Sequence, residues 1–385
     1  MVQTLNEVES NQPVERVSAF LSRVARLFAA NAFQPHRIFR GGHAQTLAAF
    51  AWPRRSKFKL VCDQERLFET APDVKVLAHC RWQQNPADHA TMIIWHGIEG
   101  SSASTYMLSM ADKAFVAGFN VVRMNLRTCG GTEHLTPTIY HGGLTDDLRA
   151  VVSELIEHDG LSRLFLVGFS LGGNMVLKLA GEYGNKAPPE VLALCAVSPS
   201  IDLQASAQLI LKRSNWLYQQ DFVRRLKQRL RRKHKLFPNV YDISGLSSVR
   251  TLREFDDRYT SRAYGFNGAD DYYYRASSIR VIDRIRIPTL IIHAEDDPFI
   301  PFAPMLDAAI TNNRHILLVV TKQGGHVAFI SDKPRSSNHS LPDTSDPGLR
   351  AQHSVLSGQY SALLEDRFWA ENRVVEFCQL ANQIF

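Results

Sequence analysis

The sequence predicts an α/β fold: a mostly parallel, doubly wound sheet with a helical cap inserted late in the chain. Apolar runs such as 92–95, 164–167 and 191–198 have the continuous hydrophobicity of strands that are buried on both faces. Stretches with helical spacing of apolar residues follow them, and strands that alternate with helices favour a parallel sheet. The alternation stops over residues 200–284 and resumes with the apolar run 287–293. We therefore expect one sheet, interrupted by a helical insertion.

The composition fits one large folded unit. With 385 residues, 45% hydrophobic and 21% charged, the chain can bury a sizeable core. The net charge of +6 is modest, and much of the excess lies in residues 221–237, so it does not indicate a nucleic-acid partner. The apolar stretch 17–33 is interrupted by charges, so neither a membrane span nor a secretory signal is predicted. The odd, scattered cysteines favour reduced thiols and a cytoplasmic protein: Cys62, Cys80, Cys129, Cys195 and Cys378.

We divide the chain into four parts. Residues 1–32 are expected to form an amphipathic extension, and residues 33–199 the first part of the core. Residues 200–284 are helix-rich in pattern and form the expected cap over the strand ends, where ligands bind in open α/β sheets. Residues 285–385 complete the core, with a mobile loop expected at 331–359 because that stretch is rich in Ser, Pro, Asp and Asn.

Each element follows from a local pattern. Apolar residues at helical spacing predict a helix over 17–28, and turn formers in 33–47 indicate an ordered loop followed by a short helix. Alternating runs at 58–62 and 74–78 predict an antiparallel sheet edge. The remaining expected elements are strands at 92–95, 119–125, 164–167, 191–198, 287–293 and 315–320, and helices at 104–117, 145–158, 175–180, 304–311 and 363–384.

The motif around Ser170 is the main chemical signal. Gly168-Phe169-Ser170-Leu171-Gly172 stands between a predicted strand and a predicted helix. On such a sharp turn a serine hydroxyl is lifted clear of the sheet, and the flanking glycines avoid clashes. The Leu171 amide at the helix start can then hold a developing oxyanion. The alternative is a chance motif in which Ser170 merely caps a helix.

A glycine-punctuated loop follows the strand 92–95. The loop is His96-Gly97-Ile98-Glu99-Gly100. In α/β hydrolases with a serine nucleophile, the loop at this place supplies the second oxyanion donor, so we expect the Ile98 amide to act together with the Leu171 amide. The alternative is a tight strand-to-helix turn with no catalytic role. We interpret His96 as a hydrogen-bonded loop histidine rather than a catalytic one.

An acid and a histidine follow two later strands. His326 lies in Gly324-Gly325-His326 after the last predicted strand and is the candidate base for Ser170. Asp297 lies just beyond the strand 287–293, and we prefer it to the adjacent Asp296 as the carboxylate that orients His326. Adjacent side chains in extended backbone point oppositely, so only one of the two can face the imidazole. Ser, Asp and His in this chain order are typical of α/β hydrolases.

Other polar groups are ambiguous. Residues 221–237 place apolar side chains on one helical face among many cations. Contact with an anionic membrane surface or an acidic acyl carrier is one interpretation. We prefer a solvated cap helix. Five polar residues in the region of the strand 119–125 and the polar loop after it could contact a substrate, although we favour a loop-fixing role for them: Asn125, Arg127, Tyr140, His141 and Asp146.

The chain resembles the YheT-like branch of the α/β-hydrolase superfamily, the group that includes ABHD-type esterases and yeast medium-chain acyltransferases. The early His-x-Gln-Thr and the later Leu-Arg-Glu-Phe-Asp-Asp are more specific to this branch than Gly-x-Ser-x-Gly, which is generic. The resemblance spans about residues 33 to 330, and its closing helix matches 368–371. The matching stretches are 42–47, 96–101, 125–127, 140–143, 168–174, 252–257, 296–299 and 324–327.

The resemblance implies a serine hydrolase that cleaves carboxylic esters of acyl or aryl type with Ser170, Asp297 and His326, without metal or organic cofactor. Transfer of the acyl group to an alcohol is the alternative, and a non-catalytic lipid-binding protein is a further one. The expected partner is a small ester, and the sequence predicts no oligomeric state. Residues 127–130 depart from the Arg-Gly-Cys that is usual in the family, and 331–359 resembles an insertion beside the His326 loop.

Overall fold

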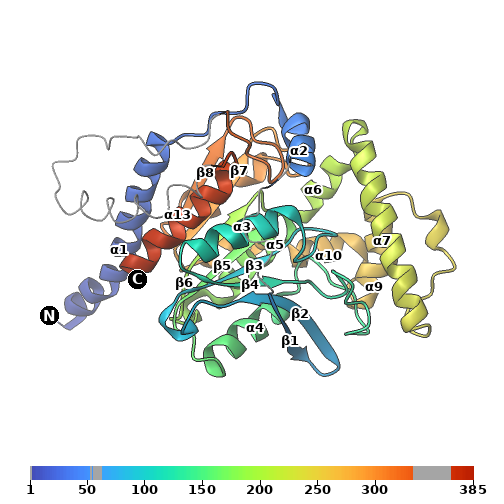
Figure 1. Cartoon of the computed structure of the whole chain (residues 1–385), viewed down its shortest axis with the longest axis horizontal. Coiled ribbons are helices and arrows are strands. Elements are labelled where there is room, and N and C mark those ends of the chain that lie inside the picture. Colours follow the sequence, from blue (N-terminus) through green and yellow to red (C-terminus); the bar gives the residue numbers. More distant parts are fainter. Residues whose placement is uncertain (1, 53, 55–62, 333–365) are drawn as a thin grey trace.

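The computed structural model describes residues 2–52, 54, 63–332 and 366–385 (Figure 1). Within these residues, eight strands form one sheet in the order β1-β2-β4-β3-β5-β6-β7-β8. The strands are β1 (Gln64–Ala71), β2 (Val74–Arg81), β3 (Thr91–Trp95), β4 (Asn120–Met124), β5 (Leu164–Phe169), β6 (Val191–Val197), β7 (Thr289–Ala294) and β8 (Ile316–Thr321).

Helices cover this sheet and fill the segment between β6 and β7. The α-helices are α1 (Val2–Ala30), α2 (Gly42–Ala51), α3 (Thr105–Val116), α4 (Thr145–Glu157), α5 (Leu171–Tyr183), α6 (Leu203–Ile210), α7 (Trp216–Leu236), α8 (Leu252–Phe255), α9 (Ser261–Ala263), α10 (Gly268–Ala276), α11 (Ala308–Thr311) and α13 (Trp369–Ile384). A π-helical turn, Asp256–Thr260, joins α8 to α9. Short 3₁₀ helices occupy Pro86–Asp88, Gly184–Lys186, Arg213–Asn215, Leu246–Ser248, Ser278–Arg280, Ile282–Arg284 and Ala303–Leu306.

The sheet is mostly parallel, as the sequence predicts. Strands β4, β3, β5, β6, β7 and β8 pair in parallel, whereas β2 pairs antiparallel with both β1 and β4. Strand β5 lies between β3 and β6, so the loops that follow β3 and β5 meet at the carboxyl edge of the sheet. The six strands predicted from 92–95 to 315–320 are confirmed as β3 to β8, with ends that differ by one or two residues, and β8 is only partly buried.

The antiparallel edge differs in one respect from the expectation. The predicted strand at 74–78 is confirmed as β2, but its partner is Gln64–Ala71, while 58–62 lies outside the described residues. In β1 only Phe68 is fully buried, and charged residues such as Glu65 and Glu69 face outward. A strand with one apolar anchor among charges has no clear hydrophobic alternation, so the sequence did not reveal it.

Two predicted helices are also corrected. The helix expected over 304–311 is broken at Asp307, whose extended backbone (φ −59°, ψ 140°) separates Ala303–Leu306 from α11. The Asp307 carboxylate then caps α11 by accepting a hydrogen bond from the Ala309 amide at 2.8 Å. The last helix begins at Trp369, and most of the loop predicted at 331–359 lies outside the described residues.

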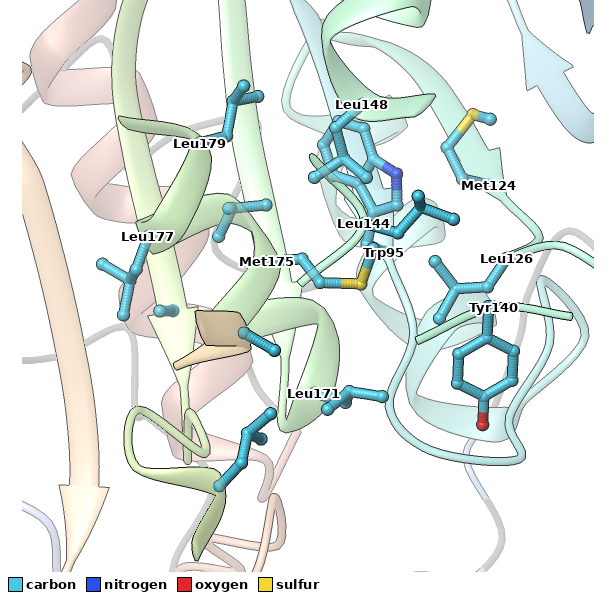
Figure 2. Packing of buried hydrophobic residues seen from close by; sticks show 14 of the residues in the cluster. Trp95, Met124, Leu126, Tyr140, Leu144, Leu148, Leu171, Met175, Leu177 and Leu179 are labelled. Carbon is cyan, nitrogen blue, oxygen red and sulfur yellow. The ribbon is translucent and has the colours of Figure 1, made fainter. Parts of the chain in front are cut away.

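Each face of the sheet has its own hydrophobic core because successive strand residues point to opposite faces. On one face, Trp95 lies beside Leu148 of α4 and Met175 of α5 (Figure 2). On the other face, Met92 and Ile94 pack with residues of α1, α3 and α13. Burying each such side chain stabilises the fold by about 1.5–3 kcal/mol.

The N-terminal helix packs on the body of the protein. In α1 the apolar residues with helical spacing are buried in the second core, and Phe20 contacts the rings of Phe377 and Phe385 at centroid distances of 5.3 Å. The predicted amphipathic character of residues 17–28 is therefore confirmed. The side chains that it buries are Val17, Phe20, Leu21, Val24 and Phe28.

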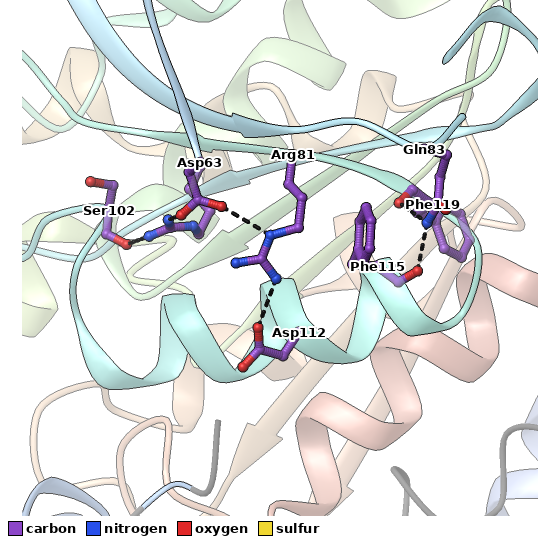
Figure 3. Close-up of polar contacts among 8 residues, drawn as sticks. Asp63, Arg81, Gln83, Ser102, Asp112, Phe115 and Phe119 are labelled. Atoms are coloured by element: carbon purple, nitrogen blue, oxygen red, sulfur yellow. Dashed lines mark hydrogen bonds and ion pairs between the residues drawn. The ribbon is translucent and has the colours of Figure 1, made fainter. Parts of the chain in front are cut away.

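A buried ionic network ties the antiparallel edge to the centre of the sheet. Figure 3 shows Arg81 of β2 between Asp63 and Asp112. Its Nε atom lies 2.9 Å from Asp63 Oδ1, and its Nη1 atom lies 2.9 Å from Asp112 Oδ1. Arg123 of β4 pairs with Asp63 as well and donates to the carbonyl of Ser102. The network joins β2, β4 and α3 to the loop that follows β3, and so holds that loop at its far end.

Only helices and loops lie between β6 and β7. Helices α6, α7, α9 and α10 gather at one end of the sheet (Figure 1). The basic stretch 221–237 falls almost entirely in α7, where Leu226 and Leu230 are buried. The exact limits of the cap, 200 and 284, stay a prediction.

Candidate active site

Ser170 occupies a strained turn between β5 and α5. Its backbone angles are φ 53° and ψ −116°, a left-handed conformation that costs a non-glycine residue about 1–3 kcal/mol. The flanking glycines are required by close approach. A Cβ atom on Gly168 would lie 2.3 Å from the carbonyl oxygen of Gly172, and one on Gly172 would lie 2.6 Å from that of Trp95. The turn therefore fixes the Ser170 side chain at the carboxyl edge of the sheet.

His326 and Asp297 are hydrogen-bonded to each other. Nδ1 of His326 lies 2.8 Å from Oδ2 of Asp297. The other carboxylate oxygen accepts from the amides of Phe299 at 2.8 Å and Ile300 at 3.0 Å. Burial acts to raise the pKa of Asp297, but the charge of His326 and these hydrogen bonds outweigh it, so the pKa is lowered. An ionised Asp297 places the proton of neutral His326 on Nδ1 and leaves Nε2 free to accept one.

Asp296 has a different role from Asp297. Its Oδ1 atom accepts a hydrogen bond from the Gly325 amide at 2.9 Å, and burial raises the pKa of its carboxyl group. Asp296 thus shapes the glycine turn that precedes His326, whereas Asp297 contacts the imidazole itself.

Helix α2 clamps the loop that carries His326. Thr46 Oγ1 accepts from the His326 amide at 2.9 Å and donates to the Gly42 carbonyl at 2.7 Å. Gln45 exchanges two hydrogen bonds with the backbone of Ile330, at 2.8 and 3.1 Å. A Cβ atom on Gly325, where φ is 60°, would lie 2.5 Å from the Gly42 carbonyl oxygen. We assigned no role to Gln45 or Thr46 from the sequence. The family motif at 42–47 was the signal that could have indicated one.

The loop after β3 lies directly against Ser170. A Cβ atom on Gly97 would lie 2.9 Å from the Ser170 Cβ atom. The amides of Gly97 and Glu99 are used within the loop, since each donates to a tyrosine hydroxyl, at 2.9 and 3.0 Å. Within the described residues, the Ile98 amide has no acceptor among the hydrogen bonds of this loop. Leu171 is the first residue of α5, so its amide also lies outside the helical ladder.

His96 fixes the same loop. Its Nδ1 atom lies 2.7 Å from the Gly97 carbonyl oxygen, and its Nε2 atom accepts from the Leu126 amide at 3.1 Å. Burial lowers the pKa of His96 to about 4, so the ring is neutral at pH 7. These contacts agree with its interpretation as a loop histidine.

The other polar residues mainly fix loops. Asn125 Oδ1 accepts from the Ser102 amide at 2.9 Å, and Arg127 makes a bidentate ion pair with Asp147 at 2.6 and 2.7 Å. Asp146 is exposed on α4. Tyr140 and His141, by contrast, line a cavity, and burial lowers the pKa of His141 to about 3.

A cavity opens between the carboxyl edge of the sheet and the helices that follow β6. Ser170, His326, Ile98 and Leu171 all lie in its wall, so the structure brings the predicted site residues except Asp297 to one space. Asp297 is behind His326. Most of the remaining wall is apolar or aromatic: Ile139, Leu203, Ala207, Ile210, Phe222, Leu226, Leu252, Phe255, Tyr272, Tyr273, Phe299 and Ile300. A wall of this kind suits an apolar ligand.

Two charged residues in this wall were not singled out from the sequence. Arg229 of α7 and Asp256 of the π-helical turn both line the cavity. Asp256 accepts from Thr260 Oγ1 and from the Tyr273 hydroxyl, each at 2.8 Å, and burial raises its pKa to about 6. Ser200 also lines the cavity, and its hydroxyl has no hydrogen-bond partner among the residues that the structure describes.

Three further properties concern metal ions, membranes and thiols. In residues 63–332 and the other described parts, no three His, Cys, Asp or Glu side chains are grouped so as to hold a metal ion. No helix in the described chain is both long and apolar enough to span a membrane. Four described cysteines are free and buried: Cys80, Cys129, Cys195 and Cys378.

The chain is similar to a family of known fold, to several named proteins and to solved structures. A family model described as alpha/beta hydrolase fold matches residues 90–333. "Putative esterase YheT" of Escherichia coli (strain K12) is 34% identical over 312 residues, 80% of this chain and 89% of that protein. Phospholipase ABHD3 of Mus musculus is 30% identical over 241 residues, 62% of this chain and 58% of that protein. The solved esterase Pf2001 of Pyrococcus furiosus has 18% identity and a TM-score of 0.45, covering 69% of this chain and 85% of its own.

Proposed function

The chain belongs to the α/β hydrolase fold family, in its YheT-like branch, and from that premise we propose that it cleaves carboxylic esters with Ser170 as nucleophile. The observation that carries the proposal is the hydrogen bond between His326 and Asp297, in a wall that His326 shares with Ser170. An oriented neutral imidazole is what a serine needs in order to attack an acyl carbonyl at neutral pH.

The proposed reaction has two steps. In the first, Ser170 Oγ attacks the carbonyl carbon and His326 Nε2 takes the serine proton, then passes it to the leaving alcohol. In the second, His326 takes a proton from water, the hydroxide attacks the acyl-enzyme, and the acid leaves as Ser170 recovers its proton. Asp297 stays ionised throughout and stabilises the imidazolium.

The amides of Ile98 and Leu171 are the proposed oxyanion donors. Both residues line the cavity beside Ser170, and neither amide is used by the surrounding loop or helix ladder. A backbone donor that is aimed where charge develops can lower the barrier by about 2.7–4 kcal/mol. The positive end of α5 would add to this effect at Leu171.

The apolar wall supports an ester with an acyl or aryl group as the substrate. The cavity wall is mostly apolar, and aromatic side chains form much of it, as is typical of sites that bind apolar groups. One relative of the chain is named as a phospholipase, and a phospholipase acts on ester bonds of lipids. Initial rates on p-nitrophenyl esters of graded chain length test this proposal, and we expect acyl esters to be cleaved faster as the chain fills the cavity.

Two alternatives make different demands on the chain. Transfer of the acyl group to an alcohol would use the same residues, with the alcohol in place of water. A non-catalytic lipid-binding protein would not need a hydrogen-bonded His326 and Asp297, so we prefer an enzyme.

Contact of α7 with an anionic membrane surface also stays an alternative. Two of its cations, Arg229 and Lys233, point into the protein, whereas Arg224, Arg231 and Lys235 are exposed. We prefer a solvated helix for this stretch. Co-sedimentation with phosphatidylglycerol vesicles tests the choice, and a solvated helix predicts no more binding than to phosphatidylcholine vesicles.

A further inference from the structure

We propose that Arg229 is a positioning residue for the oxyanion loop, and that its contact with Glu99 couples helix α7 to the catalytic centre. The inference rests on the proposed function, because it assigns a role to the loop that presents the Ile98 amide. No sequence motif indicated a catalytic or positioning role for Arg229, because it lies in residues 221–237, which we interpreted as a solvated basic helix.

Arg229 is a buried cation with three partners on the core. Its guanidinium group forms an ion pair with the Glu99 carboxylate, and the two side chains are only 5% and 7% exposed. The same group donates to Cys129 Sγ at 3.2 Å and lies over the Tyr140 ring at 4.4 Å from its centroid. Burial acts to lower the pKa of Arg229, but the charge of Glu99 outweighs it, so the pKa is raised and the guanidinium group keeps its charge.

Glu99 lies in the part of the oxyanion loop that needs support. The Gly100 amide donates to the Gly97 carbonyl at 3.1 Å, which closes a four-residue turn with Glu99 in its third position. There Glu99 has φ 54°, a conformation that favours glycine and costs other residues about 1–3 kcal/mol. Such a conformation persists only where neighbouring groups fix it.

The neighbouring groups are Tyr140 and Arg229. The Tyr140 hydroxyl accepts from the Glu99 amide and donates to Glu99 Oε1, both at 3.0 Å. Arg229 pairs with the same carboxylate oxygen from the side of α7. Backbone and side chain of Glu99 are therefore both held, and the turn that contains Ile98 keeps its shape beside Ser170.

A buried ion pair is weak evidence that its residues serve only to stabilise the fold. Replacing such a pair with apolar groups of similar volume is often neutral or stabilising, because desolvation offsets the attraction between the charges. Here the pair joins α7 to the residue that follows Ile98, and Arg229 itself lies in the cavity wall. Its position therefore favours a role in the geometry of the loop.

The test separates geometry from stability. Arg229→Met alone leaves Glu99 as an unpaired buried charge, so it is compared with the double variant Arg229→Met/Glu99→Gln, in which no charge is orphaned. We expect the double variant to regain most of the wild-type Tm, while its kcat on a p-nitrophenyl ester stays lower by on the order of 100-fold with KM nearly unchanged. Inhibition by a trifluoromethyl ketone, which forms the oxyanion, should weaken by a similar factor.

The control comes from the same helix. Arg232 forms an ion pair with Glu133 of the core, but its side chain is 57% exposed and the pair lies outside the oxyanion loop. Arg232→Met should keep wild-type kcat, and Arg229→Lys should recover part of the activity lost in Arg229→Met. A double variant with wild-type Tm and wild-type kcat would overturn the proposal. Failure of the proposed function gives a different result, because the wild-type protein itself would then fail to cleave esters.

Discussion

The imidazole of His326 is hydrogen-bonded to Asp297, with Nδ1 and Oδ2 2.8 Å apart, while the adjacent Asp296 holds the Gly325 amide instead. The two neighbouring carboxylates thus act on one loop in different ways. Asp297 sets the orientation and tautomer of the ring, and Asp296 sets the backbone that carries it. This division allows the two residues to be tested against each other.

We predict that Asp297→Asn lowers kcat by on the order of 10³- to 10⁴-fold, because an amide can hold the ring in the wrong tautomer and cannot stabilise the imidazolium. The matched control is Asp296→Asn, whose Oδ1 can still accept from Gly325. We expect it to lose less than about 10-fold. Steady-state rates with a p-nitrophenyl ester measure both. A larger loss in Asp296→Asn would assign the acid to the other carboxylate.

Thr46 should affect catalysis through the His326 backbone. Thr46→Val removes the acceptor of the His326 amide and leaves that N–H without a partner, so we expect kcat to fall roughly 10- to 100-fold while KM changes little. Thr46→Ser keeps the hydroxyl and should retain most of the wild-type rate. Equal activity in the Val and Ser variants would show that the clamp from α2 does not position His326.

The buried carboxyl group of Asp256 should make stability depend on pH. Burial raises its pKa to about 6, so the folded state binds a proton more tightly than the unfolded chain does. The stability that this proton provides is full below the unfolded pKa and is lost as pH rises through 6. We predict that Asp256→Asn, which cannot ionise, gains Tm relative to wild type between pH 5 and pH 7.5. A difference in Tm that is constant over this range would contradict the assignment.

Hydrolysis and acyl transfer can be told apart by their products. With a p-nitrophenyl ester and excess ethanol, we expect the free acid to be the main acyl product, as water completes the second step. Chromatography of the acyl products measures the ratio. An ethyl ester as the main product would favour the acyltransferase alternative instead.

The strands and the candidate triad were predictable because their signals are local. Strands β3 to β8 are rich in apolar residues, and Ser170 is flanked by glycines at which an added Cβ atom would clash. Strand β1 was missed because charged residues surround its one buried anchor, Phe68. The choice between Asp297 and Asp296 was argued from strand geometry alone, and only coordinates show which carboxylate meets His326.

Contacts between distant segments were harder to foresee. Gln45 and Thr46 act on a loop about 280 residues later, so no local pattern reveals their role. Arg229 lay among exposed basic residues, although its spacing from Leu226 and Leu230 places it beside the apolar stripe of α7. A cation on such a stripe is the sequence signal that indicates a buried partner.

The most direct test is the rate of ester hydrolysis by Ser170→Ala, measured alongside labelling by a fluorophosphonate probe. Our account predicts that the wild-type protein is labelled at Ser170, and that the variant is unlabelled and slower by on the order of 10⁵- to 10⁶-fold, with a cooperative unfolding transition like that of the wild type. A folded Ser170→Ala protein that keeps wild-type activity or labelling would contradict the central claim.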